Sequence, residues 1–246
     1  MNISILVPTR KRVNNVKRLL QSIHDTALHS ELIEIIFYVD HDDQESIDFI
    51  QALSNNSKIK TGIKLHVDKR DKPGYIYEQL YKKAAGNIIM TAADDIKFNT
   101  KKWDYLVQEE FNFYPDKILL VFGYDGLQPP GSIATHYFQS REAIEKVGYV
   151  MPKDFGYNYS DNWMTTMYRA IGRLSYIPIY VEHIHWGAGK APYDEIYKEG
   201  SDAPHEESII LYQDKERRDR DIEILKQGID ENLCFYDRYY EEEFPL

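Results

Sequence analysis

Two adjacent carboxylates, Asp94 and Asp95, come shortly after the apolar segment 87–91, and a third, Asp40, ends the apolar segment 33–39. Because carboxylates that share a site repel one another, such a cluster requires a cation. Mg²⁺ and Mn²⁺ prefer oxygen ligands and typically bridge carboxylates to the phosphates of a substrate. The sequence therefore indicates a divalent-cation site. The alternative is that each aspartate caps the helix after its strand, although a pair at this position favours the metal.

Cationic and further polar side chains also follow the other predicted strands. Thr9, Arg10 and Arg12 follow the first apolar segment, and Asp68 and Arg70 follow the third. A loop with only a connecting role would be rich in Gly, Asn and Ser. A nucleotide needs only one or two local cations, and these loops supply them.

The elements that would position these groups alternate along the chain. Apolar runs at 3–7, 33–39, 63–67, 87–91 and 118–122 predict buried strands, and amphipathic stretches between them predict helices. Gly86 is expected to cap the carboxyl end of the third helix. Such alternation predicts an α/β, Rossmann-like fold with a mostly parallel central sheet and helices on both faces. In such sheets the ligand binds beyond the carboxyl ends of the strands, where the polar clusters fall.

Composition and missing motifs exclude several classes of protein. The 30 Lys and Arg against 40 Asp and Glu leave a net charge of −10, which argues against nucleic acid as a partner. No apolar run is long enough for a transmembrane segment and no signal peptide is evident, so we expect a soluble, cytoplasmic protein. The sequence contains no dinucleotide-binding Gly-x-Gly-x-x-Gly, no phosphate-binding loop and no Gly-x-Ser-x-Gly elbow.

The ordered set of motifs resembles the family 2 glycosyltransferases, which have the GT-A fold. The opening of the family is matched by Ile5-Leu6-Val7-Pro8-Thr9-Arg10-Lys11-Arg12. A strand ending in Asp40, the segment Ala85-Gly86-Asn87 and a strand leading into Asp94-Asp95 follow in the family's order. The resemblance covers about residues 3 to 100 well and continues more loosely to about 190. It implies transfer of a sugar from a nucleoside-diphosphate sugar, with Mn²⁺ or Mg²⁺ as cofactor and inversion at the anomeric carbon.

The resemblance also implies roles for single residues. Pro8, Thr9, Arg10 and Arg12 would approach the nucleotide, and Asp40 would hydrogen-bond its base or ribose. Arg70 would contact the base or the diphosphate. Asp94 and Asp95 match the Asp-x-Asp motif, with Asp95 as the expected metal ligand and Asp94 as a donor-binding residue. Ala93 fills the motif's first acidic position, so the sequence leaves open which carboxylate binds the metal.

In the second half of the chain, the resemblance places the catalytic base at Asp161, which opens a predicted helix. Taken locally, Asp161 is also a suitable helix cap, with Ser160 as a competitor. His183 and His185 point to the same face if their segment is extended, and His185 is the expected third ligand, which would favour Mn²⁺. The alternative is a pair of hydrogen-bonded, partly buried histidines. Trp186, Tyr157 and Tyr159 are candidates to stack on an acceptor sugar or to serve only in packing.

We therefore expect a single domain, 1–246, with a nucleotide-sugar-binding lobe at about 1–125. An acceptor lobe and a carboxyl-terminal helical extension would follow at about 126–246, and the extension would include one charged helix from Glu206 to about Gln227. The expected donor is a nucleoside-diphosphate sugar, with UDP as the default, and the acceptor is a hydroxyl group of a glycan or lipid-linked saccharide. Two alternatives remain: a metal-dependent hydrolase built on His183, His185 and the carboxylates, and a non-catalytic nucleotide- or sugar-binding module.

Overall fold

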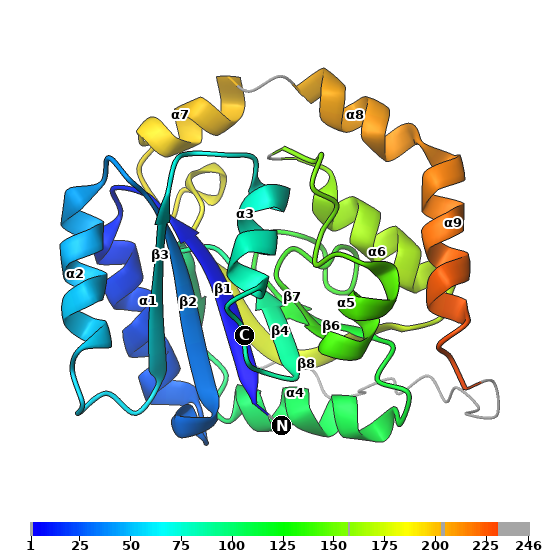
Figure 1. Ribbon diagram of the computed structural model, residues 1–246, viewed down its shortest axis with the longest axis horizontal. Coiled ribbons are helices and arrows are strands. Elements are labelled where there is room, and N and C mark those ends of the chain that lie inside the picture. The colour runs from blue at the N-terminus through cyan, green and yellow to red at the C-terminus, as the bar shows by residue number, and fades with distance from the viewer. Residues whose placement is uncertain (1, 157, 203–204, 231–246) are drawn as a thin grey trace.

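A computed structural model of the chain describes residues 2–156, 158–202 and 205–230. One eight-stranded sheet, of order β3-β2-β1-β4-β7-β6-β8-β5, runs through it (Figure 1). The strands are β1 (Ile3–Thr9), β2 (Ile33–Asp40), β3 (Gly62–Asp68), β4 (Ile88–Thr91), β5 (Ile96–Phe98), β6 (Leu120–Tyr124), β7 (Tyr137–Ser140) and β8 (Leu174–His183).

Helices connect these strands. The α-helices are α1 (Val13–Thr26), α2 (Gln44–Ser54), α3 (Pro73–Tyr81), α4 (Trp103–Phe113), α5 (Arg141–Val147), α6 (Ser160–Ala170), α7 (Glu195–Asp202), α8 (His205–Gln213) and α9 (Lys215–Lys226). Two short 3-10 helices are η1 (Ser30–Leu32) and η2 (Trp186–Ala188). None of the helices in the described part of the chain has the length and apolar character needed to cross a membrane.

The amino-terminal half is the parallel α/β unit that the hydrophobic pattern predicts. β1 pairs in parallel with β2 and β4, and β2 pairs in parallel with β3. Alternate residues of β1 face opposite sides: Ile5 belongs to a core that includes α1 and α4, whereas Leu6 packs with α3 and α5. Helices therefore cover both faces, and the predicted fold class is confirmed.

The other half of the sheet is mixed. β7 lies antiparallel between β4 and β6, and β5 pairs antiparallel with β8. β6 and β8 pair in parallel and pack with α5, α6 and α9 around a second core. The antiparallel β5–β8 pair is important for the site, because it brings His183 opposite Ile96, the residue after Asp95.

Two local expectations are wrong. Gly86 does not cap α3, which ends at Tyr81; a Cβ at Gly86 would lie 2.6 Å from Ser4 Oγ, so the glycine allows close approach to β1. The single charged helix expected at about 206–227 is broken into α8 and α9, because the Asp214 side chain caps a new helix by accepting from the Arg217 N–H.

The close approach at Gly86 gives a stability prediction. Gly86→Ala places a methyl group against Ser4 and the Asn2 carbonyl, and we expect a loss of about 1–3 kcal/mol in the free energy of unfolding. Urea denaturation measures it. Gly156→Ala is the control, because among the described residues beyond its chain neighbours only Ser208 Oγ lies within 4 Å of the new Cβ. Equal changes in the two variants would contradict the packing role of Gly86.

Candidate active site

The candidate site lies where β1, β2 and β4 end. In Figure 1, β1 rises from the N-terminus at the bottom of the view, and α7 passes above its carboxyl end. A hydrogen bond of 2.6 Å from Thr9 Oγ1 to Asp94 Oδ2 joins the end of β1 to the segment after β4. The structure thus brings two of the predicted polar clusters together, as parallel neighbouring strands require.

Asp94 is buried and surrounded by donors from the β1–α1 segment. Besides Thr9, Asn15 Nδ2 lies 3.2 Å and an Arg12 guanidinium nitrogen 3.4 Å from Asp94 Oδ1. Burial, followed by the charge of neighbouring Asp95, raises the pKa of Asp94 to about 6. The carboxylate is therefore held in place although its charge is costly there.

Asp95 is equally buried and shares Arg12 with Asp94, since the guanidinium also lies 3.9 Å from Asp95 Oδ2, but its other partners differ. The Tyr197 hydroxyl donates to Asp95 Oδ2 at 2.7 Å. Asp95 Oδ1 makes no hydrogen bond and lies 3.4 Å from His183 Nε2. Burial alone would raise the pKa of Asp95, but the contacts with His183 and Tyr197 outweigh it and hold the pKa below its usual range. Of the two carboxylates, Asp95 is the one with a buried oxygen left without a donor.

Three histidines gather beside Asp95. The His183 ring lies 5.0 Å from that of His185 and 4.9 Å from that of His136, measured between centroids. Burial lowers the pKa of His136 to about 3, so this imidazole is neutral, and its Nε2 makes no hydrogen bond. His185 accepts the Gly187 N–H through Nδ1, and its ring packs on Tyr197. The structure places His183 Nε2 3.4 Å from Asp95 Oδ1, whereas the His185 side chain contacts His183, Trp186, Gly187 and Tyr197.

These residues can hold part of a metal's coordination shell. Within residues 2–156, 158–202 and 205–230, no three His, Cys, Asp or Glu side chains come together to hold a metal ion unaided. Asp95 Oδ1, which accepts no hydrogen bond, and the adjacent imidazoles nevertheless fit a divalent cation. Mg²⁺-type cations commonly take one or two carboxylates from the protein and the remaining ligands from substrate phosphates and water. The protein thus offers only some of the ligands that the cation needs, which leaves positions for substrate phosphates and water.

The predicted cations of the nucleotide site form ion pairs. Arg10 bonds to Asp40 at 2.9 Å and also to Asp42. Burial raises the pKa of Asp40, and the charges of Arg10 and Arg70 act against that rise. Arg10 and Arg70 therefore both lie close enough to Asp40 to affect its charge. Pro8 lies opposite Tyr38 of β2, one residue before the end of β1 from which this loop departs.

Helix α7 supplies acidic partners for the cations of the crevice. Asp194, just before α7, binds Arg12 through two nitrogens at 2.7 and 2.8 Å. Glu195 pairs with Lys11 at 3.1 Å, and Glu199 pairs with Arg70. The segment 194–199 therefore borders the same crevice as the loops after β1 and β3.

Asp161 is the second residue of α6 and is partly buried. It does not cap the helix, and nor does Ser160: the N-cap position is Tyr159, in a left-handed conformation with φ 69°. The Asp161 carboxylate accepts the Asn162 N–H at 2.8 Å. Burial raises the pKa of Asp161. Asp125 adds to this rise, and His183 acts against it. Asp161 therefore lies within electrostatic range of Asp125 and His183.

The aromatic candidates differ in their surroundings. Tyr159 stacks on Tyr212 with centroids 5.5 Å apart, so its packing role is established. Trp186 is 40% exposed and contacts Tyr193, which is 51% exposed, beside His185. Tyr157 lies outside the described residues.

Sequence reasoning missed Asn15, His136, Asp194 and Tyr197. Asn15 lies in the first turn of α1, where polar residues are common, so its type does not indicate a functional role. Asp194 carries a weak signal, since it precedes a helix and accepts the Tyr197 N–H at 3.0 Å as a cap would. His136 and Tyr197 carry no local signal, because their partners are distant in the sequence.

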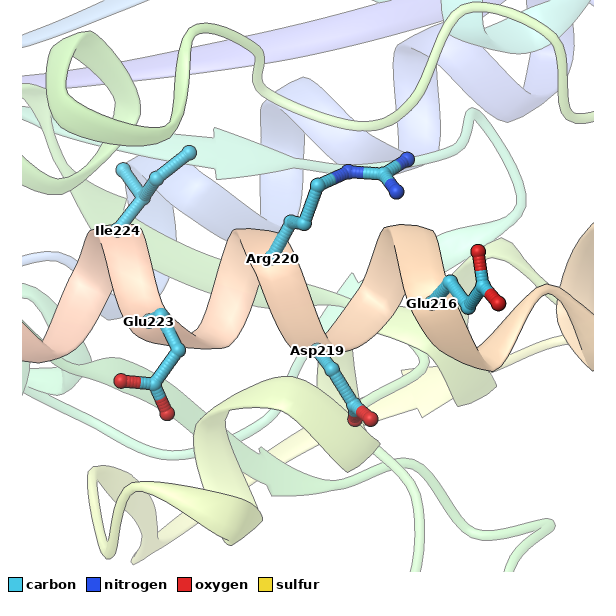
Figure 2. Close-up of a pocket in the computed structure, with 5 residues that line it drawn as sticks. All are labelled: Glu216, Asp219, Arg220, Glu223 and Ile224. Atoms are coloured by element: carbon cyan, nitrogen blue, oxygen red, sulfur yellow. The ribbon is translucent and has the colours of Figure 1, made fainter.

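A groove along α9 is separate from this site. Figure 2 shows its lining side chains, which are Glu216, Asp219, Arg220, Glu223 and Ile224. None of these residues contacts the acidic pair in the described structure, and the groove plays no part in the proposed chemistry.

Solved structures with the same fold are known. A mannosyltransferase from Pyrobaculum calidifontis, in complex with GDP-Man and Mn²⁺, superposes with a TM-score of 0.62 at 11% identity, over 92% of this chain and 73% of that one. S. aureus TarS 1-349 with UDP gives 0.58 at 14% identity, over 74% and 60%. GalNAc-T7 with UDP, GalNAc and Mn²⁺ gives 0.62 at 12% identity, over 89% and 54%.

The chain therefore has the GT-A fold of glycosyltransferases, as the motif resemblance implied. It spans 60% of the TarS fragment and 54% of the GalNAc-T7 structure. Neither a family model nor a curated protein sequence matches the chain.

The raised pKa of Asp94 gives a stability prediction. A carboxyl whose folded pKa is above its unfolded value stabilises the fold most at low pH, and this contribution is lost as the pH rises to about 6. We therefore expect Asp94→Asn to stabilise the protein at pH 7.5 without nucleotide or metal, by up to about 3 kcal/mol, with a smaller gain at pH 4.5. Chemical denaturation at both pH values measures this. Asp219→Asn, on the exposed surface of α9, is the control; a pH-independent effect of Asp94→Asn would refute the explanation.

Proposed function

We propose that this protein is a metal-dependent, inverting glycosyltransferase that moves a sugar from a nucleoside-diphosphate sugar to a hydroxyl acceptor. The observation that carries the proposal is the buried Asp94–Asp95 pair at the end of β4 in a GT-A fold, with one Asp95 oxygen unpartnered. The two buried carboxylates share one guanidinium, that of Arg12, which Asp194 also binds, so a divalent cation would further stabilise the pair. The fold presents the pair where α/β sheets bind ligands.

The proposed donor site consists of Pro8, Thr9, Arg10, Arg12, Asp40, Arg70 and Asp94. Three features support it: its place at the strand ends, its cations and the nucleotide ligands of similar structures. TarS structures contain UDP or UDP-GlcNAc, and the mannosyltransferase contains GDP-Man. UDP remains our default. Since Arg12 and Arg70 pair with Asp194 and Glu199, a bound diphosphate would compete with these acids for the two guanidinium groups.

The proposed chemistry is a direct displacement. Asp161 accepts the proton of the acceptor hydroxyl while that oxygen bonds to the anomeric carbon and the bond to the diphosphate breaks. The raised pKa of Asp161 suits a general base. Arg12, which contacts Asp94 and Asp95, would offset the charge that develops on the departing diphosphate. A divalent cation, Mn²⁺ or Mg²⁺, would be held by Asp95 with His185 or the nearer His183, and when bound it supplies further stabilisation of the diphosphate.

We propose that the chain forms one domain with two lobes, one for the donor and one for the acceptor. The residues up to about 125 would hold the donor, and the residues after it, with Asp161 and the exposed Trp186, would bind the acceptor. A glycan or lipid-linked saccharide remains the proposed acceptor class, because an aromatic ring such as that of Trp186 can stack on a sugar.

Donor binding is tested by thermal shift with UDP, GDP, CDP or TDP, each with Mn²⁺, Mg²⁺ or EDTA. A ligand that binds only the folded protein stabilises it by about 2.7 kcal/mol at a hundredfold excess over its dissociation constant. We expect one nucleoside diphosphate to raise the melting temperature only when metal is present. Stabilisation by metal alone would favour a hydrolase, and no response to any combination would reject the proposed donor site.

The role of Asp161 is tested by Asp161→Asn. We expect transfer to fall about 10²–10⁴-fold, because the general base is lost, while nucleotide-dependent stabilisation is retained. Product formation with a panel of sugar nucleotides and glycan acceptors measures transfer, and the exposed Asp219→Asn is the control. If wild type binds donor but neither protein forms product, a binding module becomes the better description.

A further inference from the structure

Tyr197, on α7, reaches the acidic pair from a distant part of the chain. Its hydroxyl donates to Asp95 Oδ2 at 2.7 Å, across 102 residues of sequence, and lies 3.4 Å from the carbonyl of Ile184. Nothing in the motif resemblance assigns this tyrosine a role. It donates a short hydrogen bond to one Asp95 oxygen, whereas His183 Nε2 lies 3.4 Å from the other.

The ring of Tyr197 is fixed on both sides. The guanidinium of Arg12 lies 4.2 Å from the ring centroid, and the His185 ring packs against it at 4.8 Å in an edge-on arrangement. Asp194 holds the same Arg12 and also accepts the Tyr197 N–H. Because ring and backbone are both held, the direction of the hydroxyl is set before any ligand binds.

The two Asp95 oxygens therefore have different surroundings. Oδ2 is occupied by the phenol, which prevents rotation of the carboxylate, and Oδ1 is left without a hydrogen bond, 3.4 Å from His183 Nε2. Groups that hydrogen-bond to a metal ligand fix its orientation and commonly contribute 10- to 100-fold to metal affinity.

We propose that Tyr197 is a positioning residue that holds the Asp95 carboxylate so that Oδ1 is presented to a divalent cation. The inference rests on the proposed metal-dependent function. It makes α7 part of the metal site without requiring any α7 side chain to touch the ion.

The test is Tyr197→Phe, which removes only the hydroxyl and keeps the ring between Arg12 and His185. Mn²⁺ binding is followed by the electron paramagnetic resonance signal of free Mn²⁺, with the nucleoside diphosphate selected by thermal shift held at saturation. We expect the dissociation constant for Mn²⁺ to rise about 10- to 100-fold. Tyr193→Phe, an exposed tyrosine just before α7, is the matched control and should bind Mn²⁺ as wild type does. Unchanged affinity in Tyr197→Phe would overturn the proposal.

A second measurement separates positioning from simple anchoring of α7. Amide hydrogen exchange across residues 195–202 should stay as slow in Tyr197→Phe as in wild type, because the ion pairs of Asp194, Glu195 and Glu199 remain. Faster exchange together with lost affinity would show an anchoring role and reject positioning. If wild type itself binds no Mn²⁺, the proposed metal-dependent function fails; if wild type and the variant bind equally, only the role of Tyr197 fails.

Discussion

The burial of two adjacent carboxylates at the end of β4 is the constraint on which the rest of the site depends. Charges of the same sign in a poorly solvated place must be compensated, and each aspartate is compensated differently. Asp94 takes donors from the β1–α1 segment, namely Thr9, Asn15 and Arg12. Asp95 shares Arg12 at 3.9 Å and takes its other contacts from His183 and Tyr197. The acidic pair thus connects the parallel half of the sheet to β8 and α7.

Such a pair is a poor choice for stability alone. A fold optimised only for packing would place apolar or uncharged residues there. Buried charges of this kind, which reduce stability, are typical of functional sites. The same reasoning applies to His136, which is buried and neutral with an unpartnered nitrogen, and to the cations that α7 neutralises. In this crevice, opposite charges are already paired, so a phosphate-bearing ligand would exchange one set of ionic contacts for another.

Much of the fold followed from local patterns. The segments 3–7, 33–39, 63–67 and 87–91 are the cores of β1 to β4, and Ser140 caps α5 as its sequence suggests. Expectations failed where a distant contact decided the outcome. Gly86 looked like a helix cap but allows the close approach of Ser4, which is 82 residues away in the sequence. A local pattern contains no information about a neighbour 80 residues away.

The sequence by itself determined the class of fold and the polar strand ends, because buried strands and their ends are encoded in short stretches of apolar and polar residues. It thereby placed Asp40, Asp94 and the Arg10–Arg12 segment at one edge of a sheet. Only the tertiary structure decided the partners of each group. It set His183 beside Asp95, joined Asp194 to Arg12, and brought the Tyr197 hydroxyl to the acidic pair. Those contacts arise from the antiparallel β5–β8 pairing and from the path of α7 across the crevice, and neither feature has a local signature in the sequence.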